Sequence, residues 1–469
     1  MIQMEKTVKA RLPLTLGEVI DISKEFGQSP IEVILTEAKI QTGKSRQGVL
    51  SEALAQFEHN FKAIEIGLST GESLLFGTLG TQLNDIKGTK LIGDEFVDKA
   101  LTYTLAAQVG NHTIGLRPCA GTGDPCPYTG LLKAMMESGY EESRISEIAC
   151  LMLKVGSMFR VGKITTGCNM EGFGAGATAI AAAMVELKGG TAEDMERAMV
   201  LAISPTIAVP CTPRVMVPGL CATHIGGAIL IGNMAAGLAV NTSLEVNVPI
   251  DVMMAVVTEV HPISAKHVVP TVIKYMEPFF KTNPAVEKLI DEEIKQKEQA
   301  EINKAIQEAD LIAKKLAEGA SSITDTLGEA VAGGSSQAVG SPTNAARIAH
   351  HLAKGNIKKV KVELYSELFA RRGINIPGIL MGAVFGVSTS DYSMYAEVMG
   401  KVEKMGIQVD ILEVEEFQLQ RITIETDDVC SMVDTLNRGG GRLVLRDASP
   451  CKEKALEIAN KLGIVLVNQ

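Results

Sequence analysis

The stretch Gly174-Ala-Gly-Ala-Thr-Ala-Ile-Ala-Ala-Ala-Met-Val-Glu-Leu-Lys-Gly-Gly-Thr191 shows most directly how the larger part of this chain folds. It consists mainly of alanine and glycine. Gly189-Gly190 ends one helix, and Thr191 with Asp194 begins the next. The same composition, with added methionine, extends outward from about Phe96 to Pro278. Small side chains let helices approach closely, so we predict a compact and largely buried helical bundle.

Helix signals continue toward the N-terminus. Thr15-Leu-Gly-Glu18 is a capping box, and Gly27 ends the helix that it opens. Ser29 is predicted to cap a further helix that has Pro30 at its first position. Residues 1–282 are therefore predicted to form one all-helical domain.

The chain changes character after this domain. Residues 283–320 are heavily charged, which predicts a solvated helix within a linker over residues 283–324. Gly333–Gly340 is predicted to be a flexible loop, followed by a helix through His351. Beyond that helix the sequence predicts strands around 360–364, 422–424, 443–445 and 464–466, and helices over 391–405 and 449–462, the second capped by Ser449 and Pro450. Residues 325–469 are thus a smaller α+β domain, and the fold class is multi-domain, all-α followed by α+β.

Composition restricts the classes of function. The 469 residues carry a net charge of −10 and no basic stretch, which argues against nucleic-acid binding. The first residues are charged and lack the apolar core of a signal peptide. The low-charge run 222–243 is interrupted by four glycines, so a buried helix explains it better than a membrane span. The eight cysteines indicate reduced thiols, metal binding or core packing, and we expect a cytoplasmic protein.

Three cysteines of the helical part are candidate metal ligands. Cys168, Cys211 and Cys221 each follow a glycine or proline within two residues. Such neighbours suit a thiolate presented from a turn or a helix end, where backbone N–H groups face the sulfur. Three thiolates can hold an iron–sulfur cluster and leave one iron open to a substrate oxygen. Ordinary burial of cysteine in the core is the alternative.

Longer motifs resemble those of one enzyme family. The helical part contains Leu14-Thr-Leu-Gly-Glu-Val-Ile20, Thr42-Gly-Lys-Ser-Arg46, Arg117-Pro-Cys-Ala-Gly-Thr-Gly123, Gly167-Cys-Asn-Met-Glu-Gly172 and Glu186-Leu-Lys-Gly-Gly-Thr191. The last part contains Gly334-Ser-Ser-Gln-Ala-Val-Gly340, Val362-Glu-Leu-Tyr365 and Gly439-Gly-Gly441. With these motifs the chain resembles the iron–sulfur-dependent L-serine dehydratase (L-serine ammonia-lyase) family. Residues 12–278 resemble its α part and residues 325–469 its β part, fused with α first.

The resemblance implies a lyase that uses a [4Fe–4S] cluster to deaminate L-serine to pyruvate and ammonia. Cys168, Cys211 and Cys221 would be its ligands, and the cluster would be sensitive to oxygen. The β part would close the site. We expect a small-molecule substrate, a homo-oligomeric (dimeric) protein, and neither nucleic acid nor membrane as a partner.

Candidate site residues follow from chemistry and motif together. His112 precedes a glycine-rich turn and His224 follows Cys221 by about one helical turn, so both are candidate proton acceptors. The residues predicted to bind substrate are Arg117, Gly121, Thr122, Gly123, Ser335, Ser336 and Gln337. Cys119 and Cys126 are interpreted as structural. Cys451 is interpreted as part of an exposed helix, with a role as a displaceable ligand as the alternative.

The chain departs from the family pattern at two histidines. A Ser-Ser-His-Thr loop of the family is Ser335-Ser-Gln-Ala338 here, and a Lys-Gly-His-Gly stretch is Arg371-Arg-Gly-Ile374. Neither Gln nor Ile can transfer a proton near neutral pH. A related lyase acting on another small amino or hydroxy acid, such as a cysteine desulfidase-like enzyme, and a non-catalytic cluster-bearing protein are therefore the alternatives.

Overall fold

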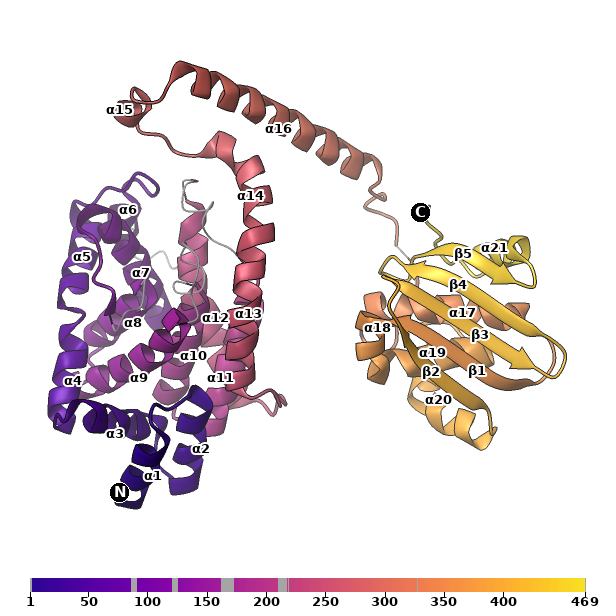
Figure 1. Ribbon diagram of the computed structural model, residues 1–469, viewed down its shortest axis with the longest axis horizontal. Helices are drawn as coiled ribbons and strands as arrows, with labels where there is room; N and C mark the ends of the chain where they lie inside the picture. The colour runs from indigo at the N-terminus through magenta and orange to yellow at the C-terminus, as the bar shows by residue number, and fades with distance from the viewer. Residues whose placement is uncertain are drawn as a thin grey trace. The chain divides into compact units, whose positions relative to one another are not determined.

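The structure is a computed structural model that describes residues 2–85, 91–119, 125–161, 173–209, 217, 219–326 and 328–468. The chain forms two compact units, residues 1–317 and 318–469 (Figure 1). The first unit is built from helices, and the second combines a five-stranded sheet with helices. The prediction of a large helical part followed by a small α+β part is confirmed.

The helices of the first unit follow one another through short connections. In chain order they are α1 (Ile2–Arg11), α2 (Leu16–Phe26), α3 (Pro30–Thr42), α4 (Arg46–Ala55), α5 (Glu58–Ser69), α6 (Leu79–Asp85), α7 (Glu95–Ile114), α8 (Cys126–Glu137), α9 (Glu142–Val161), α10 (Ala175–Leu187), α11 (Ala192–Ile203), η3 (Ser204–Thr206), α12 (Leu220–Asn241), α13 (Ile250–His267), α14 (Val269–Met276), η5 (Glu277–Phe279), α15 (Pro284–Glu287) and α16 (Glu292–Glu318).

Local capping determines several helix boundaries. The Thr15 side chain accepts the N–H of Glu18 to begin α2, and Gly27 ends that helix with a left-handed φ of 60°. Ser29 caps α3, and Thr191 with Asp194 forms a capping box at the start of α11. These boundaries agree with the predictions because caps depend on residues close in sequence.

Small residues make the centre of the first unit dense. Every residue of α10 from Ala175 to Val185 is buried. The helix packs along α12 so closely that a Cβ on Gly232 would lie 2.6 Å from Ile180 Cγ2. The predicted close approach of helices is therefore observed at this pair.

Two helices test other expectations. By length and composition α12 could cross a membrane, but half of its apolar window is buried inside the first unit, as in a core helix. The charged helix α16 is exposed along most of its length, with Ala305 as its buried residue, and Lys274 of α14 forms an ion pair with its Glu308. A solvated helix was predicted for this segment.

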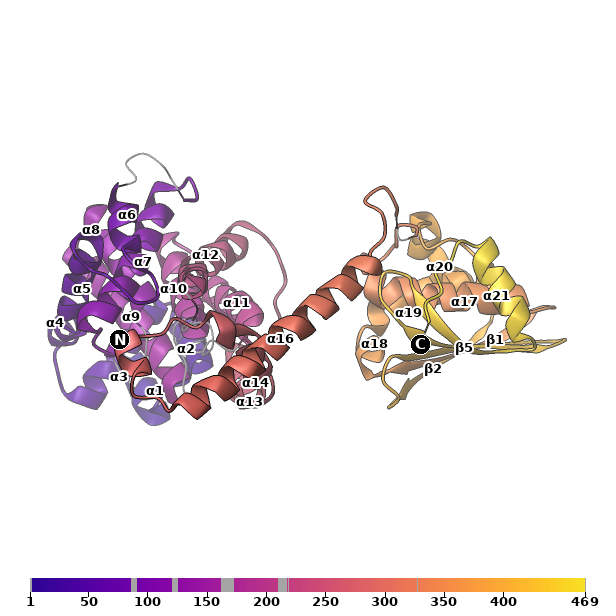
Figure 2. The same cartoon turned by 90° about the horizontal axis from the view of Figure 1, so that it is seen from above.

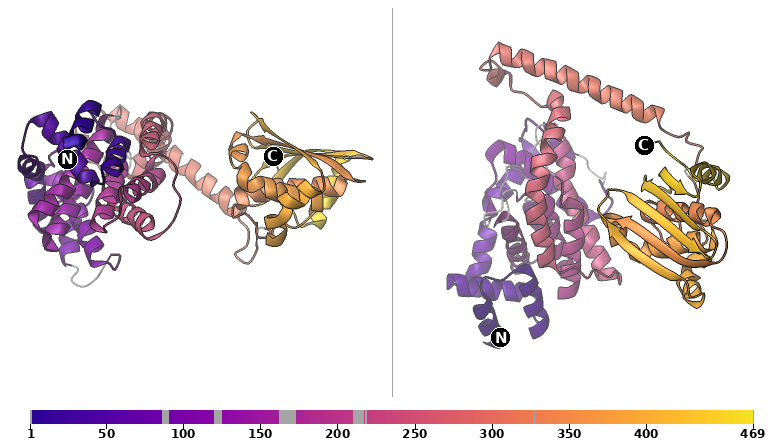
Figure 3. Two further views of the ribbon diagram at one scale, coloured as in Figure 1. Left: turned by 90° about the horizontal axis from the view of Figure 1, so that it is seen from below. Right: turned by 45° about the vertical axis from the view of Figure 1, so that its right-hand side comes forward.

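The second unit is a mixed sheet with helices on one face (Figures 2 and 3). Its elements are η6 (Ser336–Gly340), α17 (Ser341–Leu352), β1 (Ile357–Tyr365), α18 (Ser366–Ala370), α19 (Arg372–Phe385), α20 (Tyr392–Lys404), β2 (Gln408–Val414), β3 (Leu419–Thr426), β4 (Cys430–Asn437), β5 (Leu443–Ser449) and α21 (Lys452–Lys461). The strand order is β2-β1-β3-β4-β5, with β1 and β2 parallel and the other pairs antiparallel.

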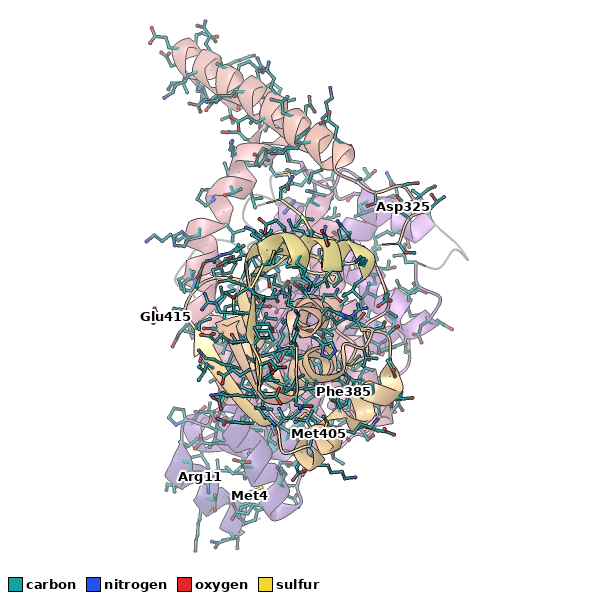
Figure 4. All side chains as sticks on the ribbon, turned by 90° about the vertical axis from the view of Figure 1, so that its right-hand side faces the viewer. Met4, Arg11, Asp325, Phe385, Met405 and Glu415 are labelled. Carbon is teal, nitrogen blue, oxygen red and sulfur yellow. The ribbon has the colours of Figure 1, made fainter. Side chains whose placement is uncertain are left out.

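Alternation along β1 assigns the two faces of this sheet. Val360, Val362 and Leu364 are fully buried in the core shared with α17 and α19. Lys359 alternates with them and pairs with Asp410 of β2 at 2.7 Å. Figure 4 draws the side chains of this unit, with Phe385 marking the end of α19 and Glu415 following β2.

Three predictions for the second unit are wrong in detail. Ser336–Gly340 is not a flexible loop but a short π-helical turn that continues into α17, and its last three residues are buried. Residues 464–466 form an isolated bridge to Leu443 rather than a strand. Ser449 ends β5, so α21 begins later, with Cys451 as its N-cap residue. Strands β2 and β4 were not predicted.

Candidate functional site

The structure describes part of the predicted site. Of the three predicted ligands it contains Cys221, whereas Cys168 and Cys211 lie outside the described residues, as do Gly121, Thr122 and Gly123. Cys221 and His224 both lie near the start of α12 and are 1% and 6% exposed. Both side chains are therefore buried on one helix, about one turn apart; that they face a cluster stays a prediction.

Three helices converge around these two side chains. The ring of His224 packs on Phe173, with centroids 4.4 Å apart, at the entry to α10. A Cβ on Gly176 of α10 would lie 3.0 Å from Pro127 of α8 and 3.2 Å from Ala228 of α12. The first residues of α8 and α10 thus meet the first turns of α12. In the sequence, Cys168 precedes Phe173 by five residues and Cys211 precedes Cys221 by ten.

A second cysteine belongs to the same buried region. Cys126, the first residue of α8, shares a cluster of packed apolar side chains with Cys221 and Ile225 of α12. Its thiol donates to Gln108 Oε1, 2.7 Å away on α7. We interpreted Cys126 as structural, and its place beside Cys221 makes it a residue to test together with the predicted ligands.

His112 is held by the turn before α6. Ser73 Oγ accepts the N–H groups of Leu75 and Phe76, each at 3.1 Å, and lies 2.6 Å from His112 Nδ1. Two accepted hydrogen bonds occupy both lone pairs of a hydroxyl, so the Ser73 O–H donates to Nδ1. On the other side of the ring, Gln108 Nε2 lies 3.3 Å from His112 Nε2; because Nδ1 accepts from Ser73, Nε2 carries the proton of the neutral ring, and this contact between two donors is not a hydrogen bond.

Desolvation acts on the same histidine. Its ring packs near Phe76, with centroids 5.4 Å apart, and partial burial lowers the pKa of His112 below its ordinary value of 6.5. The imidazole therefore stays neutral at physiological pH. A neutral ring whose Nδ1 accepts from Ser73 can take up a proton that reaches it through the Ser73 hydroxyl.

An open hollow lies beside Ser73 and the start of α12. Its volume is about 880 Å³, and its wall includes Ser73, Phe76, Gly219, Ala222 and Lys281. Ser73 and Phe76 contact His112, and Gly219 and Ala222 flank Cys221 in the sequence. The hydrogen bond from Gly219 N to Leu75 O, 3.1 Å long, joins the two segments. The wall of the hollow thus combines residues next to the predicted ligand Cys221 with residues that contact the predicted base His112.

The side chain of Asn60 holds the backbone of Arg117 in place. The Asn60 side chain, fully buried, accepts the N–H of Arg117 at 2.7 Å and donates to its carbonyl oxygen at 3.1 Å. The Arg117 residue itself is exposed. The same Asn60 amide donates to Cys119 Sγ at 3.3 Å, and burial raises the pKa of the Cys119 thiol to about 12. Cys119 is therefore a protonated packing residue at neutral pH, which suits a structural role.

The predicted substrate-binding residues of the second unit contact the Gly439–Gly441 motif and the end of β4, which lie much further along the chain. The Ser335 side chain caps η6 by accepting the N–H of Ala338. The carbonyl oxygen of Ser336 accepts from Gly441 N at 3.2 Å, and that of Gln337 accepts from Asn437 Nδ2 at 3.0 Å. The expectation that the β part closes the site concerns both units and stays a prediction.

No metal site is complete within the described part of the chain. Among residues 2–85, 91–119, 125–161, 173–209, 217, 219–326 and 328–468, no group of three or more His, Cys, Asp or Glu side chains is placed to hold an ion. Cys451, the alternative fourth ligand, donates to Glu453 at 3.2 Å in the second unit. The predicted set of three thiolates includes the two cysteines outside those ranges.

Sequence reasoning missed Ser73, Gln108 and Lys281. Ser73 is 3% exposed and Gln108 is 3% exposed, and both act through contacts with residues far along the chain. A polar residue that is to be buried next to a histidine has no periodic signature. Lys281 lies just before the charged segment that begins at residue 283, and no motif around it indicates a place in the wall of the hollow.

Comparison with known proteins adds no family to these observations. No model of a known protein family matches the chain, and no curated protein is significantly similar to it. Its function is therefore inferred from the chemistry of its own residues and from the motifs that they form.

Proposed function

We propose that this chain is a [4Fe–4S]-dependent lyase that deaminates L-serine to pyruvate and ammonia, resembling the iron–sulfur-dependent L-serine dehydratases. The observation that carries the proposal is the hollow in the first unit. Its wall contains the residues beside Cys221 and the residues that hold His112. A reaction that needs both a metal-bound hydroxyl and a proton acceptor requires the metal ligands and the acceptor to lie close together.

The described residues fit a thiolate-held cluster. Cys221 is buried in the first turn of α12, where backbone N–H groups without helix partners can face a sulfur ligand. The segments that carry Cys168 and Cys211 are continuous in sequence with α10 and α12, whose first turns converge. When bound by these three cysteines, a [4Fe–4S] cluster would supply an iron with an open coordination position that polarises the substrate hydroxyl.

The protein's own groups account for binding and proton transfer. Lys281 and the exposed Arg117 offer positive charge for the carboxylate of an amino acid. His112 accepts the Cα proton through Ser73, and His224 is the alternative acceptor. Loss of that proton and of the β-hydroxyl as water leaves an enamine, which tautomerises to an imine and is hydrolysed to pyruvate and ammonia. The overall change is elimination of water followed by hydrolysis, so no oxidant or reductant is consumed.

Anaerobic reconstitution tests the ligand assignment. The wild-type protein should bind about four iron and four sulfide per chain and release pyruvate from L-serine. Cys168→Ser, Cys211→Ser and Cys221→Ser should each lose the cluster, because a hard hydroxyl replaces a soft ligand. Cys430→Ser is the matched control, since Cys430 is exposed in the second unit.

Cys126→Ser separates ligation from packing. It should keep iron and sulfide at the wild-type level, because Cys126 is proposed only to pack beside Cys221. Loss of the cluster in Cys126→Ser together with retention in Cys221→Ser would show that the wrong cysteine of this buried cluster was assigned. Full iron content in any of the three ligand variants would remove that residue from the set.

A second candidate is a related lyase that acts on another small amino or hydroxy acid. The observation that favours it is Gln337, which stands where the family has a histidine and whose amide carries no labile proton. An anaerobic screen of amino and hydroxy acids, read by ammonia or sulfide release, distinguishes the two. Turnover of L-cysteine without turnover of L-serine would favour the second candidate, and turnover of neither would favour a non-catalytic protein.

A further inference from the structure

A pocket of about 440 Å³ lies wholly within the second unit, at one end of its sheet. Strand β1 ends there at Tyr365, strand β4 ends there at Asn437, and Gln418 directly precedes β3. The wall also includes Gln337 and three arginines, Arg371, Arg438 and Arg442. Its volume is that of a site for a small molecule.

The charges of this pocket are unbalanced. The wall contains Glu367, which pairs with Arg371 at 2.9 Å. Among residues 2–85, 91–119, 125–161, 173–209, 217, 219–326 and 328–468, no carboxylate forms an ion pair with Arg438 or Arg442. Three arginines against one glutamate leave an excess of two positive charges, and arginine is the side chain best shaped to bind carboxylate or phosphate.

Neutral oxygens hold the two unpaired guanidinium groups in place. Arg438 donates through Nη1 to the side chain of Gln418 and, at 3.1 Å, to the carbonyl oxygen of Asn437. Arg442 donates through Nε to Gly439 O at 3.3 Å and through Nη2 to Arg438 O at 3.0 Å. These contacts orient the guanidinium groups without neutralising them. Each guanidinium has five N–H donors, so donors remain on both for a ligand.

The glycine motif makes this arrangement possible. Gly439, Gly440 and Gly441 have φ values of 70°, 60° and 81°, a left-handed run that only glycine adopts at low cost. The turn brings its backbone against η6, where Gly441 N donates to Ser336 O. Gln337 then lies over the turn, its Cγ 3.5 Å from the position of a Cβ on Gly439. The Gly439–Gly441 motif therefore builds a rigid rim around the arginines.

We propose that this pocket binds a small dianion, either a dicarboxylate or a phosphate ester, through Arg438 and Arg442. Two fixed and uncompensated guanidinium groups match the two negative charges of such a ligand. Ser336 and Gln337 also line this pocket. The site is formed by the second unit alone, and the proposal stands whether or not the first unit is a lyase.

Calorimetric titration of the full-length protein at low ionic strength tests the proposal. The probes are inorganic phosphate and succinate as dianions, and acetate as the monoanion. One or both dianions should bind more tightly than acetate. Arg438→Gln and Arg442→Gln should each weaken binding by roughly tenfold to a hundredfold, the loss expected for one charged hydrogen-bonding partner. Arg372→Gln is the matched control, because this neighbouring arginine lies over the Phe369 ring outside the pocket.

A variant that is expected to bind the dianion more tightly provides a further test, because a gain of affinity cannot result from unfolding. Glu367→Gln removes the one acidic side chain of the wall and should tighten binding of the dianion several-fold. Binding of succinate alone identifies a dicarboxylate site, and binding of phosphate alone a phosphate site. Equal affinity for acetate and both dianions, or an unchanged affinity in all three pocket variants, overturns the proposal. Binding is read as heat, so this failure is distinct from a lack of lyase turnover.

Discussion

Replacement of Ser73 by alanine tests whether the Ser73–His112 pair is a working part of the hollow in the first unit. Ser73 is 3% exposed, accepts the N–H groups of Leu75 and Phe76 at 3.1 Å, and lies 2.6 Å from His112 Nδ1. Alanine removes all three contacts and leaves little empty volume. With about 1 kcal/mol for each lost hydrogen bond and more for a buried N–H without an acceptor, the free energy of unfolding should fall by about 2–4 kcal/mol.

The same substitution should change the pH dependence of L-serine turnover. Burial lowers the pKa of His112 from 6.5, so the wild-type ring stays neutral, and able to accept a proton, below that pH. Activity should therefore be lost only as the pH falls through the lowered value. In Ser73→Ala the neutral ring loses the hydroxyl that donates to it, its pKa rises, and the acidic loss of activity moves to higher pH.

Two measurements check these outcomes. Urea denaturation is followed by circular dichroism, because the chain contains no tryptophan. Pyruvate release is measured from acidic to neutral pH with the reconstituted protein. Ser69→Ala is the control, since that exposed hydroxyl donates to a carbonyl oxygen of its own helix, and it should change stability by less than about 0.5 kcal/mol. A Ser73→Ala protein with the stability and pH profile of Ser69→Ala would refute the proposed role of the pair.

Two further substitutions test the packing that holds the site. Glu37→Gln removes the buried carboxylate that lies 2.8 Å from the half-buried Lys154 Nζ, which keeps its hydrogen bond to Leu14 O, and should lower the free energy of unfolding by about 3 kcal/mol in urea denaturation. A loss below about 1 kcal/mol would contradict a stabilising ion pair here. Gly110→Ala places a Cβ against the carbonyl of Ala63 on the facing helix and should lower the free energy of unfolding by about 1–3 kcal/mol. The control is Gly237→Ala, which has open space around its Cβ and should be neutral or stabilising in the same assay.

Prediction from sequence succeeded where neighbours along the chain decide the structure, and failed where distant contacts decide it. Strand β4 was missed because Ser431 and Thr435 interrupt its apolar pattern. Both are fully buried, and their hydroxyls donate to Ala349 O and Gln420 O. Strand β2 was missed because it is an edge strand that depends on parallel pairing with β1. Pairing between segments so far apart leaves no local signal.

The candidate site shows the same division. The spacing of Cys221 and His224 predicted two side chains one turn apart, and α12 bears both. Nothing near His112 in the sequence indicated that Ser73 would donate to it, or that Cys126 would share a buried cluster with Cys221. Likewise, the Gly333–Gly340 segment looked flexible by composition, but its last five residues form a π-helical turn whose end, Ala338 to Gly340, is buried, and the Gly439–Gly441 turn packs against it.

The amino-acid sequence by itself determined the helix caps, the division into a helical part and an α+β part, and the motifs that suggest cluster chemistry. These depend on residue type, short spacing and composition, which local backbone preference and side-chain volume translate directly into structure. Only the tertiary structure decided which polar groups face one another: Ser73 and His112 beside one hollow, and, in another, Arg438 and Arg442 with neutral oxygens as their partners in the described part of the chain. The physical reason is that hydrogen bonding, desolvation and charge balance depend on distances between groups that only folding brings together.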